Sequence, residues 1–307
     1  MNAQPFFSIV IPVYNRAHLI GKAIASVLAQ TFRDYELIVI DDGSTDDPGS
    51  VVRQWQDPRI LFFRIPNSER GAARNEGTRH ATGTYLTFFD SDDVLYPDHF
   101  EKAHAFALEN SNPEFFHTGY NIQDDQGRQL SVAQFSRSTD RSGLHLMDQL
   151  IVTNFLGCDS VFLRRDIAIG NPFNEDRRLA SSEDWELWLR IAARYPLLSN
   201  DAVTFAMIHH PGRSLLTISP DQIIVRDKLL IDYLLKDQPF RQKFGHRLSG
   251  FRADRYTFFA LCLSLSAGRR SEAFQNLLQA FRYDPLVLTR KRFWATLRII
   301  VRSWFNK

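Results

Sequence analysis

One short apolar run leads directly into a cluster of acidic side chains. Residues 85–89 are apolar except for Thr87, which is typical of a buried β-strand, and Asp90, Asp92 and Asp93 follow at once. Carboxylates this close repel one another and lose hydration at the end of a buried strand, so they need a cation or strong hydrogen-bond donors. Mg²⁺ or Mn²⁺ suits such oxygen ligands and leaves coordination positions for water and phosphate. The alternative interpretation is a solvated acidic turn.

The same combination of an apolar run and acidic residues occurs earlier in the chain. Asp41 and Asp42 end the second predicted strand, as Asp90 and Asp92 follow the fourth. The alternation of strand and helix patterns predicts a parallel α/β sheet, in which ligands bind outside the carboxyl ends of the strands. The two acidic groups therefore predict one ligand site. We expect strands at residues 6–13, 37–40, 60–65 and 85–89, and helices at 19–28 (with Asn15 as N-cap), from Pro48, and at 71–81.

The pattern changes from mixed elements to helices near residues 212–222. We therefore expect an α/β domain over residues 1–215 and a helical region over 216–307. In the first domain we also expect helices at 97–109, within 139–153 and from 181 or 182, and strands at 114–122, 159–163 and, at an edge of the sheet, 202–208. The helical region is predicted to contain helices at 223–235, 252–267 and 271–283, followed by a basic amphipathic segment.

Glu183 and Asp184 are predicted to lie in the first turn of a helix that Ser181 or Ser182 begins. The helix dipole stabilises acidic side chains in this position by about 0.3–1 kcal/mol. This electrostatic effect is one explanation of the pair that requires no catalytic role.

The composition is that of a globular protein. The chain has 307 residues, of which 44% are hydrophobic and 23% are charged, so we expect a packed core. The N-terminus has no signal-peptide pattern, and no apolar run approaches the roughly 20 residues that span a bilayer. Cys158 and Cys262 lack the spacing of a metal site and are expected to be buried thiols. We expect a cytoplasmic protein, either free or attached to the inner face of the membrane.

The final segment, residues 286–307, contains six Lys or Arg and no acidic residue, although the whole chain has a formal net charge of only +2. A basic amphipathic helix of this kind suits peripheral contact with an anionic membrane surface. A helix that packs on the protein with a solvated basic face fits the pattern equally well. Apart from this segment, nothing in the sequence indicates nucleic-acid binding.

Five short motifs occur in a fixed order. They are Pro12-Val-Tyr-Asn15, Asp41-Asp-Gly-Ser-Thr-Asp46, Gly71-Ala-Ala-Arg-Asn-Glu-Gly77, Asp90-Ser-Asp-Asp93 and Glu183-Asp-Trp185. As an ordered set they resemble glycosyltransferase family 2, whose members are inverting enzymes that use nucleotide sugars. The resemblance covers about residues 5–215. It implies an α/β, Rossmann-like GT-A domain with a mostly parallel central sheet flanked by helices, and leaves the C-terminal helices as an appendage.

The resemblance implies roles for side chains around a nucleoside-diphosphate sugar. Pro12, Val13 and Tyr14 would line the nucleotide pocket, Asp42 or its neighbour Asp41 would reach the base, Arg74 would lie near the nucleotide, and Asp90 would face the ribose.

The resemblance also implies the metal site and the base. Asp92 would bind Mn²⁺ or Mg²⁺, and His210 could lie near the diphosphate or metal, although the adjacent His209 leaves the register open. Asp184 of the Glu183-Asp184 pair would be the general base. The metal would stabilise the leaving diphosphate, and attack by the acceptor hydroxyl from the opposite face would invert the anomeric carbon.

The implied activity is transfer of one sugar, with UDP a common carrier, to a hydroxyl of a glycan or lipid-linked acceptor in bacterial surface polysaccharide synthesis. Gln279-Ala-Phe-Arg-Tyr283 departs from the Gln-x-x-Arg-Trp motif of processive synthases, and we interpret it as a chance match. Two alternatives remain. The first is an aspartate-nucleophile phosphatase that uses Asp90 and Asp92, and the second is an inactive protein that binds nucleotide sugars.

Overall fold

The computed structural model describes residues 4–133, 144–213, 218–266 and 268–305. The chain divides into two compact units, Met1–Arg213 and Ser214–Lys307. Among the helices of the described ranges, none is both long and apolar enough to cross a membrane.

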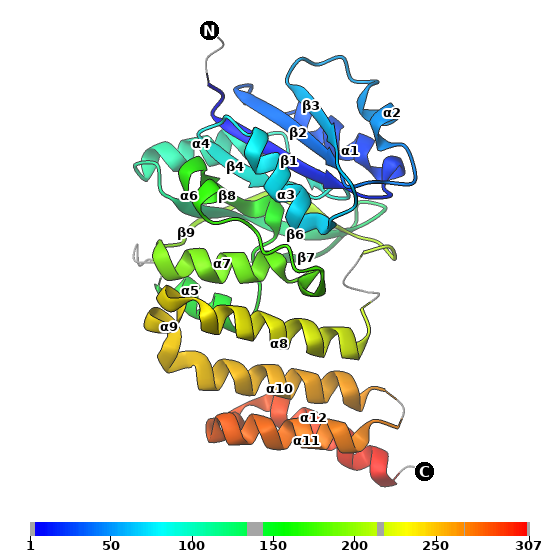
Figure 1. Ribbon diagram of the computed structural model, residues 1–307, viewed down its shortest axis with the longest axis vertical. Helices are drawn as coiled ribbons and strands as arrows, with labels where there is room; N and C mark the ends of the chain where they lie inside the picture. The colour runs from blue at the N-terminus through cyan, green and yellow to red at the C-terminus, as the bar shows by residue number, and fades with distance from the viewer. Residues whose placement is uncertain (1–3, 134–143, 214–217, 267, 306–307) are drawn as a thin grey trace. The chain divides into compact units, whose positions relative to one another are not determined.

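The first unit is built on a nine-stranded sheet within the described residues, and the ribbon is shown in Figure 1. The strand order is β3-β2-β1-β4-β8-β6-β9-β5, and β7 pairs with β6. β3, β2, β1 and β4 are parallel, whereas β8 is antiparallel to both of its neighbours. The predicted parallel α/β sheet is therefore confirmed for the N-terminal strands. The strands are β1 Phe7–Val13, β2 Tyr35–Asp41, β3 Ile60–Arg64, β4 Tyr85–Phe88, β5 Val94–Leu95, β6 Phe115–Asp124, β7 Gln129–Ala133, β8 Val161–Arg164 and β9 Leu198–His209.

Helices flank this sheet and make up the second unit. The helices of the first unit are α1 Ala17–Leu28, α2 Pro48–Val52, α3 Glu69–His80, α4 His99–Glu109, α5 Leu144–Val152, α6 Arg165–Gly170 and α7 Glu183–Arg194, with short 3-10 turns η1 Cys158–Ser160 and η2 Arg177–Leu179. Those of the second unit are α8 Pro220–Lys236, α9 Gln238–Phe244, α10 Leu248–Ser264, α11 Arg270–Tyr283 and α12 Lys291–Phe305, with 3-10 turns η4 Gly245–Arg247 and η5 Pro285–Thr289.

Alternating side chains of β1 face two different helical layers. Phe7, Ile9 and Ile11 are fully buried in one core cluster with Ile24 of α1 and Phe100 of α4. Because successive side chains of a strand point to opposite faces, the even-numbered residues of β1 face the layer that contains α3. The near-continuous apolar sequence of β1 thus reflects burial on both faces of the sheet.

At Gly77, α3 approaches β1 closely. A Cβ atom added at Gly77 would lie 2.2 Å from Cγ1 of Val10. We expect Gly77→Ala to lower the free energy of unfolding by about 1–3 kcal/mol, because overpacking outweighs the higher helix propensity of alanine. Gly170→Ala at the end of α6 is the matched control, since nothing lies within 4 Å of its added Cβ. Denaturant unfolding of both variants checks this; equal stability of the two would contradict the packing explanation.

The start of α1 differs from the prediction. Asn15 is not the N-cap residue; it has a left-handed backbone (φ 51°), and Arg16 occupies the N-cap position. The Asn15 side chain instead accepts a hydrogen bond from the backbone N–H of Thr45 (2.7 Å), and Asp46 accepts one from the N–H of Ala17 (2.8 Å). The helix is thus capped by the loop after β2, a contact that local sequence does not reveal.

Two further predictions need correction, and several elements were not predicted. The strand predicted at 202–208 is not an edge strand, because β9 pairs with β6 on one side and with the two-residue β5 on the other. The short helices α6 and α9 and the strands β5 and β7 were not predicted. Cys158 is buried as expected, but Cys262 is only half-buried. The helix expected within residues 139–153 is present as α5, and residues 139–143 lie outside the described ranges.

The second unit has its own core. Small side chains of α10 and α11, such as Ala260 and Ala273, are fully buried and allow these helices to pack closely. Val287 of η5 and Phe293 and Ile300 of α12 complete the same cluster. One face of α12 is therefore fixed by packing within this unit.

Candidate active site

The carboxyl ends of β1, β2 and β4 meet at one edge of the sheet. The N–H of Asp42 donates to the carbonyl of Val13 (2.9 Å), and the N–H of Phe89 donates to the carbonyl of Val10 (2.9 Å). The loops after β2 and β4 therefore leave the sheet on either side of β1. The chain order reverses between β1 and β4, which is where ligands bind in sheets of this type.

Asp41 and Asp42 are both buried and have different partners. Asp41 accepts a hydrogen bond from the N–H of Ser44 (2.9 Å) and lies 3.4 Å from Arg64. Asp42 accepts from the N–H of Ser68 (2.6 Å), and burial raises the pKa of its carboxyl group. Asp42 thus joins the end of β2 to the loop before α3.

Asp90, Asp92 and Asp93 converge after β4. One ligand atom from each lies within 4.8 Å of the others. Oδ2 of Asp92 accepts hydrogen bonds from Nη1 of Arg16 and from Nε2 of His210, the latter at 2.9 Å. Burial acts against ionisation of Asp92, but the neighbouring arginines outweigh it, so its pKa lies below the usual value. His210 thus reaches the acidic cluster, while His209 is exposed.

Asp93 joins this cluster to the end of β9. Its Oδ1 accepts hydrogen bonds from the N–H of Ile208 (2.8 Å) and from Nη1 of Arg213 (3.1 Å). Arg213 also donates to the carbonyl of Ile208 (2.7 Å). Burial raises the pKa of Asp93 to about 7, although Arg213 acts in the opposite direction. These bonds hold the segment that carries His210 beside Asp92.

Arg74 connects two of the predicted site residues. Its guanidinium, almost fully buried, donates to Asp90 (2.9 Å) and to Glu183 (2.7 Å). The charge is compensated on both sides, so the pKa of Arg74 is raised in spite of burial. Arg74 therefore fixes α3, the acidic loop and the start of α7 in one arrangement.

Asp184 and Glu183 differ in accessibility. Glu183 is buried against Arg74, whereas Asp184 is half-buried. Asp184 accepts hydrogen bonds from the N–H of Trp185 (2.7 Å) and from Nδ2 of Asn154 (3.0 Å). Burial, and next the charge of Glu183, raise its pKa to about 6. A carboxylate with this pKa is ionised at neutral pH yet basic enough to accept a proton.

The contacts missed at the level of sequence include two that involve Asp159 and Asn154. Oδ1 of the buried Asp159 accepts a hydrogen bond from the N–H of Asp90 (2.5 Å), and Asn154 donates to Asp184. Asp159 lies in η1 before β8, and Asn154 follows α5. A signal for Asp159 exists, since an acidic residue beside a predicted buried strand needs a partner. Asn154 carries no such signal.

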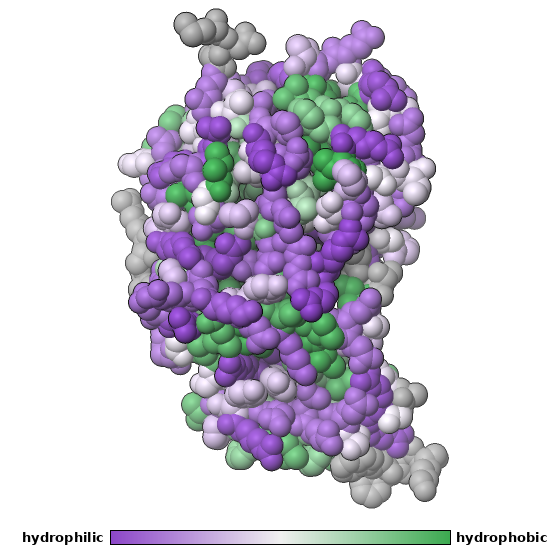
Figure 2. Space-filling view, viewed as in Figure 1, coloured by the Kyte–Doolittle hydropathy of each residue, from purple (hydrophilic) through white to green (hydrophobic). Residues whose placement is uncertain are grey.

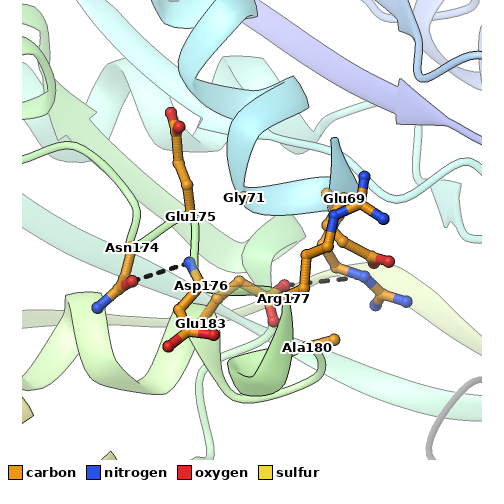
Figure 3. Close-up of a pocket in the computed structure, with 9 residues that line it drawn as sticks. Glu69, Gly71, Asn174, Glu175, Asp176, Arg177, Ala180 and Glu183 are labelled. Atoms are coloured by element: carbon orange, nitrogen blue, oxygen red, sulfur yellow. Dashed lines mark hydrogen bonds and ion pairs between the residues drawn. The ribbon is translucent and has the colours of Figure 1, made fainter. Parts of the chain in front are cut away.

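A small cavity lies beside Glu183, between the start of α3 and the segment before α7 (Figure 3). Its volume is about 190 Å³, including open solvent, which is below the roughly 300–1,000 Å³ of typical ligand pockets. Glu183 forms part of its wall, and Arg70 lies 3.8 Å from Glu183. The cavity can hold only a fragment of a nucleotide sugar. Its lining residues are Glu69, Arg70, Gly71, Asn174, Glu175, Asp176, Arg177, Ala180 and Glu183.

The N-terminal motif Pro12-Val-Tyr-Asn15 lies at the same edge of the sheet. Val13 is buried, Pro12 is half-buried, and Tyr14 is 46% exposed directly after β1. An exposed aromatic ring at the carboxyl end of a central strand is available to stack on a planar ligand.

The donor atoms at Asp92 fit a divalent cation. Three carboxylates and one imidazole meet within a short distance, and these are ligands that Mn²⁺ accepts, while Mg²⁺ prefers the oxygen atoms alone. Arg16 and His210 already contact Asp92. The carboxylate oxygens of this cluster would serve as ligands of such an ion.

The fold and the acidic strand ends together define a glycosyltransferase. The sequence model described as "Glycosyl transferase family 2" matches residues 8–168, more than half of the chain. This chain belongs to glycosyl transferase family 2.

Two relatives show the extent of the similarity. An uncharacterized glycosyltransferase of Rickettsia felis is 34% identical over 239 residues, which cover 78% of this chain and 38% of the relative. Escherichia coli WfgD, described as a UDP-Glc:alpha-D-GlcNAc-diphosphoundecaprenol beta-1,3-glucosyltransferase, is 32% identical over 60% of this chain and 68% of WfgD. The chain spans only 26–38% of the length of three Rickettsia relatives.

Solved structures share the fold at low sequence identity. Staphylococcus aureus TarS 1–349 in complex with UDP-GlcNAc has a TM-score of 0.72 and 20% identity, and the match covers 97% of this chain and 88% of TarS 1–349. Mannosyltransferase PcManGT from Pyrobaculum calidifontis, in complex with GDP-Man and Mn²⁺, has a TM-score of 0.56 and 18% identity over 100% of this chain and 89% of PcManGT. The expected α/β GT-A fold is confirmed.

Proposed function

We propose that this protein is an inverting glycosyltransferase that moves one sugar from a nucleoside-diphosphate sugar to a hydroxyl group of a glycan or lipid-linked acceptor. The observation that carries the proposal is the arrangement of Asp184. This carboxylate is half-buried, held by two hydrogen-bond donors, and linked through Glu183 and Arg74 to the acidic cluster. A base and a diphosphate site joined in this way suit a displacement at an anomeric carbon.

The donor side of the site would recognise a nucleotide. Tyr14 is exposed for stacking, Pro12 and Val13 border it, and Asp42 lies beside Asn67 in the loop before α3. We assign UDP as the carrier, supported by the names of WfgD and the TarS complex. Asp41 is better placed as a structural partner of Ser44 and Arg64 than as a ligand of the base.

Asp92 and His210 would hold Mn²⁺ or Mg²⁺, and Asp90 would face the ribose. When bound, the ion supplies positive charge that stabilises the leaving diphosphate. Arg16 contacts the same oxygen of Asp92, so it is also close enough to meet the diphosphate. The Mn²⁺ in the PcManGT complex supports the choice of a divalent metal.

Asp184 would take the proton of the acceptor hydroxyl. Attack from the side opposite the diphosphate inverts the anomeric configuration, and the base must therefore lie across the site from the acidic cluster. Glu183 is not assigned this step, because its carboxylate is buried and paired with Arg74. Glu183 would instead hold Arg74 in place.

The acceptor class is supported by the similarity to WfgD, which acts on a diphosphoundecaprenol-linked sugar. We assign the reaction to residues 1–215 and contact with the acceptor or the membrane to residues 216–307. A protein that uses such an acceptor would work at the inner face of the membrane. Membership of glycosyl transferase family 2 argues against the phosphatase alternative, and an activity assay distinguishes an enzyme from an inactive protein that binds nucleotide sugars.

A thermal-shift screen against UDP, GDP, CMP and dTDP, each with Mn²⁺, Mg²⁺ or EDTA, tests the donor site. A ligand present at about 100 times its dissociation constant stabilises the folded state by about 2.7 kcal/mol. We expect UDP to raise the melting temperature with metal and not with EDTA. Stabilisation by GDP alone would reassign the carrier, and no response to any nucleotide would contradict the proposed function.

A further inference from the structure

The charge of this chain is divided unevenly between its two units. Residues 214–307 contain 17 Lys and Arg and seven Asp and Glu, a formal net charge of +10. Residues 1–213 contain 20 and 28, a formal net charge of −8. The overall charge of +2 conceals this separation. A segregated basic region indicates an anionic partner.

Acidic side chains of the second unit form ion pairs with basic residues that precede α12. Asp227 is fully buried and pairs with Arg226 and Arg255, while Arg290 pairs with Asp254 and Asp284. In the described part of the chain, no ion pair neutralises the basic side chains that follow on α12. These are Lys291, Arg292, Arg298 and Arg302.

The exposed face of α12 combines these charges with apolar groups. Lys291, Arg298 and Arg302 lie on one side of the helix at spacings of seven and four residues, opposite the buried Phe293 and Ile300. Trp294, which is 47% exposed, lies on the same side.

The apolar part of this face continues into η5. Nε1 of Trp294 donates to the carbonyl of Leu288 (2.6 Å), and Leu286 and Leu288 are 68% and 39% exposed. Apolar patches also lie among hydrophilic side chains over α11 on the face drawn in Figure 2. We define the basic-apolar face by Leu286, Leu288, Lys291, Trp294, Arg298 and Arg302.

We propose that the basic-apolar face docks this protein on the surface of a bilayer that contains anionic phospholipids. The unpaired basic side chains complement phosphate and glycerol headgroups, and long cationic side chains keep their charge in the headgroup region while their stems lie deeper. Trp294 and the two leucines enter the boundary between headgroups and acyl chains, as indole rings and leucines do in interfacial helices. The basic side chains alone would suit any polyanion, whereas the exposed apolar side chains of this face favour a bilayer. This proposal concerns the second unit and stands whatever reaction the first unit catalyses.

The test is sedimentation of the full chain with vesicles of phosphatidylcholine alone or with about one quarter phosphatidylglycerol. We expect binding only to the anionic vesicles, with strong weakening between about 0.1 and 1 M salt. Arg298→Glu with Arg302→Glu should weaken binding at least about tenfold. Lys22→Glu with Arg53→Glu, exposed residues of the first unit, makes the same change in total charge and should leave binding unchanged.

A second pair of variants tests the apolar contribution. Leu286→Ser with Trp294→Ser should weaken vesicle binding several-fold at both salt concentrations, whereas Leu108→Ser, at a residue 54% exposed on α4, should not. Equal binding to neutral and anionic vesicles, or the same loss in the control variants, would overturn the proposal. Binding that depends on charge but not on Leu286 and Trp294 would also overturn it and indicate a soluble polyanion. Self-association that requires the same side chains without vesicles would assign the face to a second copy.

A different observation concerns Asn154. Each oxygen of the Asp184 carboxylate has one donor, the N–H of Trp185 on Oδ1 and Nδ2 of Asn154 on Oδ2. Oδ1 of Asn154 is itself buried and accepts no hydrogen bond from a described residue. Nε1 of Trp185 donates to the carbonyl of Leu150 in α5, which holds the two segments together (2.7 Å).

We infer that Asn154 is a positioning residue for Asp184, an inference that rests on the proposed function. Its amide fixes the carboxylate plane and stabilises the ionised form. Other groups act on Asp184 as well: Glu183 beside it, Arg74 from α3, Asp90 after β4, Cys158 from η1 and Tyr120 from β6.

The pH dependence of UDP release from UDP-glucose or UDP-GlcNAc, with water or acceptor, tests this role. Wild-type protein should lose activity as pH falls through about 6, because the base becomes protonated. Asn154→Ala should shift this loss of activity on the acidic side of the pH profile to higher pH. It should also lower kcat about tenfold without changing KM for the donor. Asn154→Asp should shift this loss further, since a second carboxylate faces Asp184. An acid limb unchanged in both variants would overturn the inference, whereas an inactive wild-type protein would contradict the proposed function instead.

Discussion

Asp184→Asn should lower kcat by about 10²- to 10⁴-fold while the affinity for the nucleotide donor stays unchanged. Asparagine keeps the shape of the side chain but cannot accept the proton of the acceptor hydroxyl. Asp184 is the half-buried member of the acidic pair, so the substitution removes the carboxylate that a substrate can reach. Initial rates of nucleoside-diphosphate release measure the loss, and calorimetric titration with the donor measures the affinity.

Glu183→Gln provides the contrast. Glu183 is buried and lies 2.7 Å from Arg74, so its replacement should lower the melting temperature as well as the rate. Asp184→Asn should leave the melting temperature close to the wild-type value. An Asp184→Asn protein that transfers sugar at the wild-type rate would exclude Asp184 as the base.

Asp92→Asn should remove the effect of metal on donor binding. The substitution keeps the size of the side chain but removes the negative charge that attracts a divalent cation. The metal-dependent stabilisation by nucleoside diphosphate, about 2.7 kcal/mol at 100 times the dissociation constant, should fall close to zero. Thermal shift with Mn²⁺ and with EDTA measures this difference.

Asp125→Ala is a suitable control for Asp92→Asn, because Asp125 is an exposed aspartate after β6. The control should keep the full response to metal. If Asp92→Asn kept it too, the cation would have to be held by other residues.

The sequence was sufficient to predict the elements that place the site. Buried parallel strands have near-continuous apolar sequences, and the aspartates at their ends break this pattern abruptly, so Asp41, Asp42 and Asp90 could be placed at one edge of the sheet. The family resemblance added roles for Asp184 and His210. The structure places Nε2 of His210 beside Asp92, and both roles stay predictions.

The remaining contacts join residues that are far apart in the chain. Asp93 and Arg213 are 120 residues apart, and Asp90 and Asp159 are 69 apart. No local periodicity encodes such pairs, because tertiary packing decides them. The prediction that residues 202–208 form an edge strand was wrong for a related reason. The strand β5, which pairs with β9, has only two residues, and these are too few to leave a recognisable strand pattern.

Because cationic side chains pair with the acidic cluster, we expect the protein to fold without a bound metal ion. Arg16 contacts Asp92, and Arg213 pairs with Asp93, so these carboxylates are neutralised by the chain's own side chains. A structural zinc site, in contrast, leaves its protein unfolded when a chelator removes the ion. With the metal used as we propose, the protein should therefore stay folded but inactive without the ion, and its activity should return when the ion is added back.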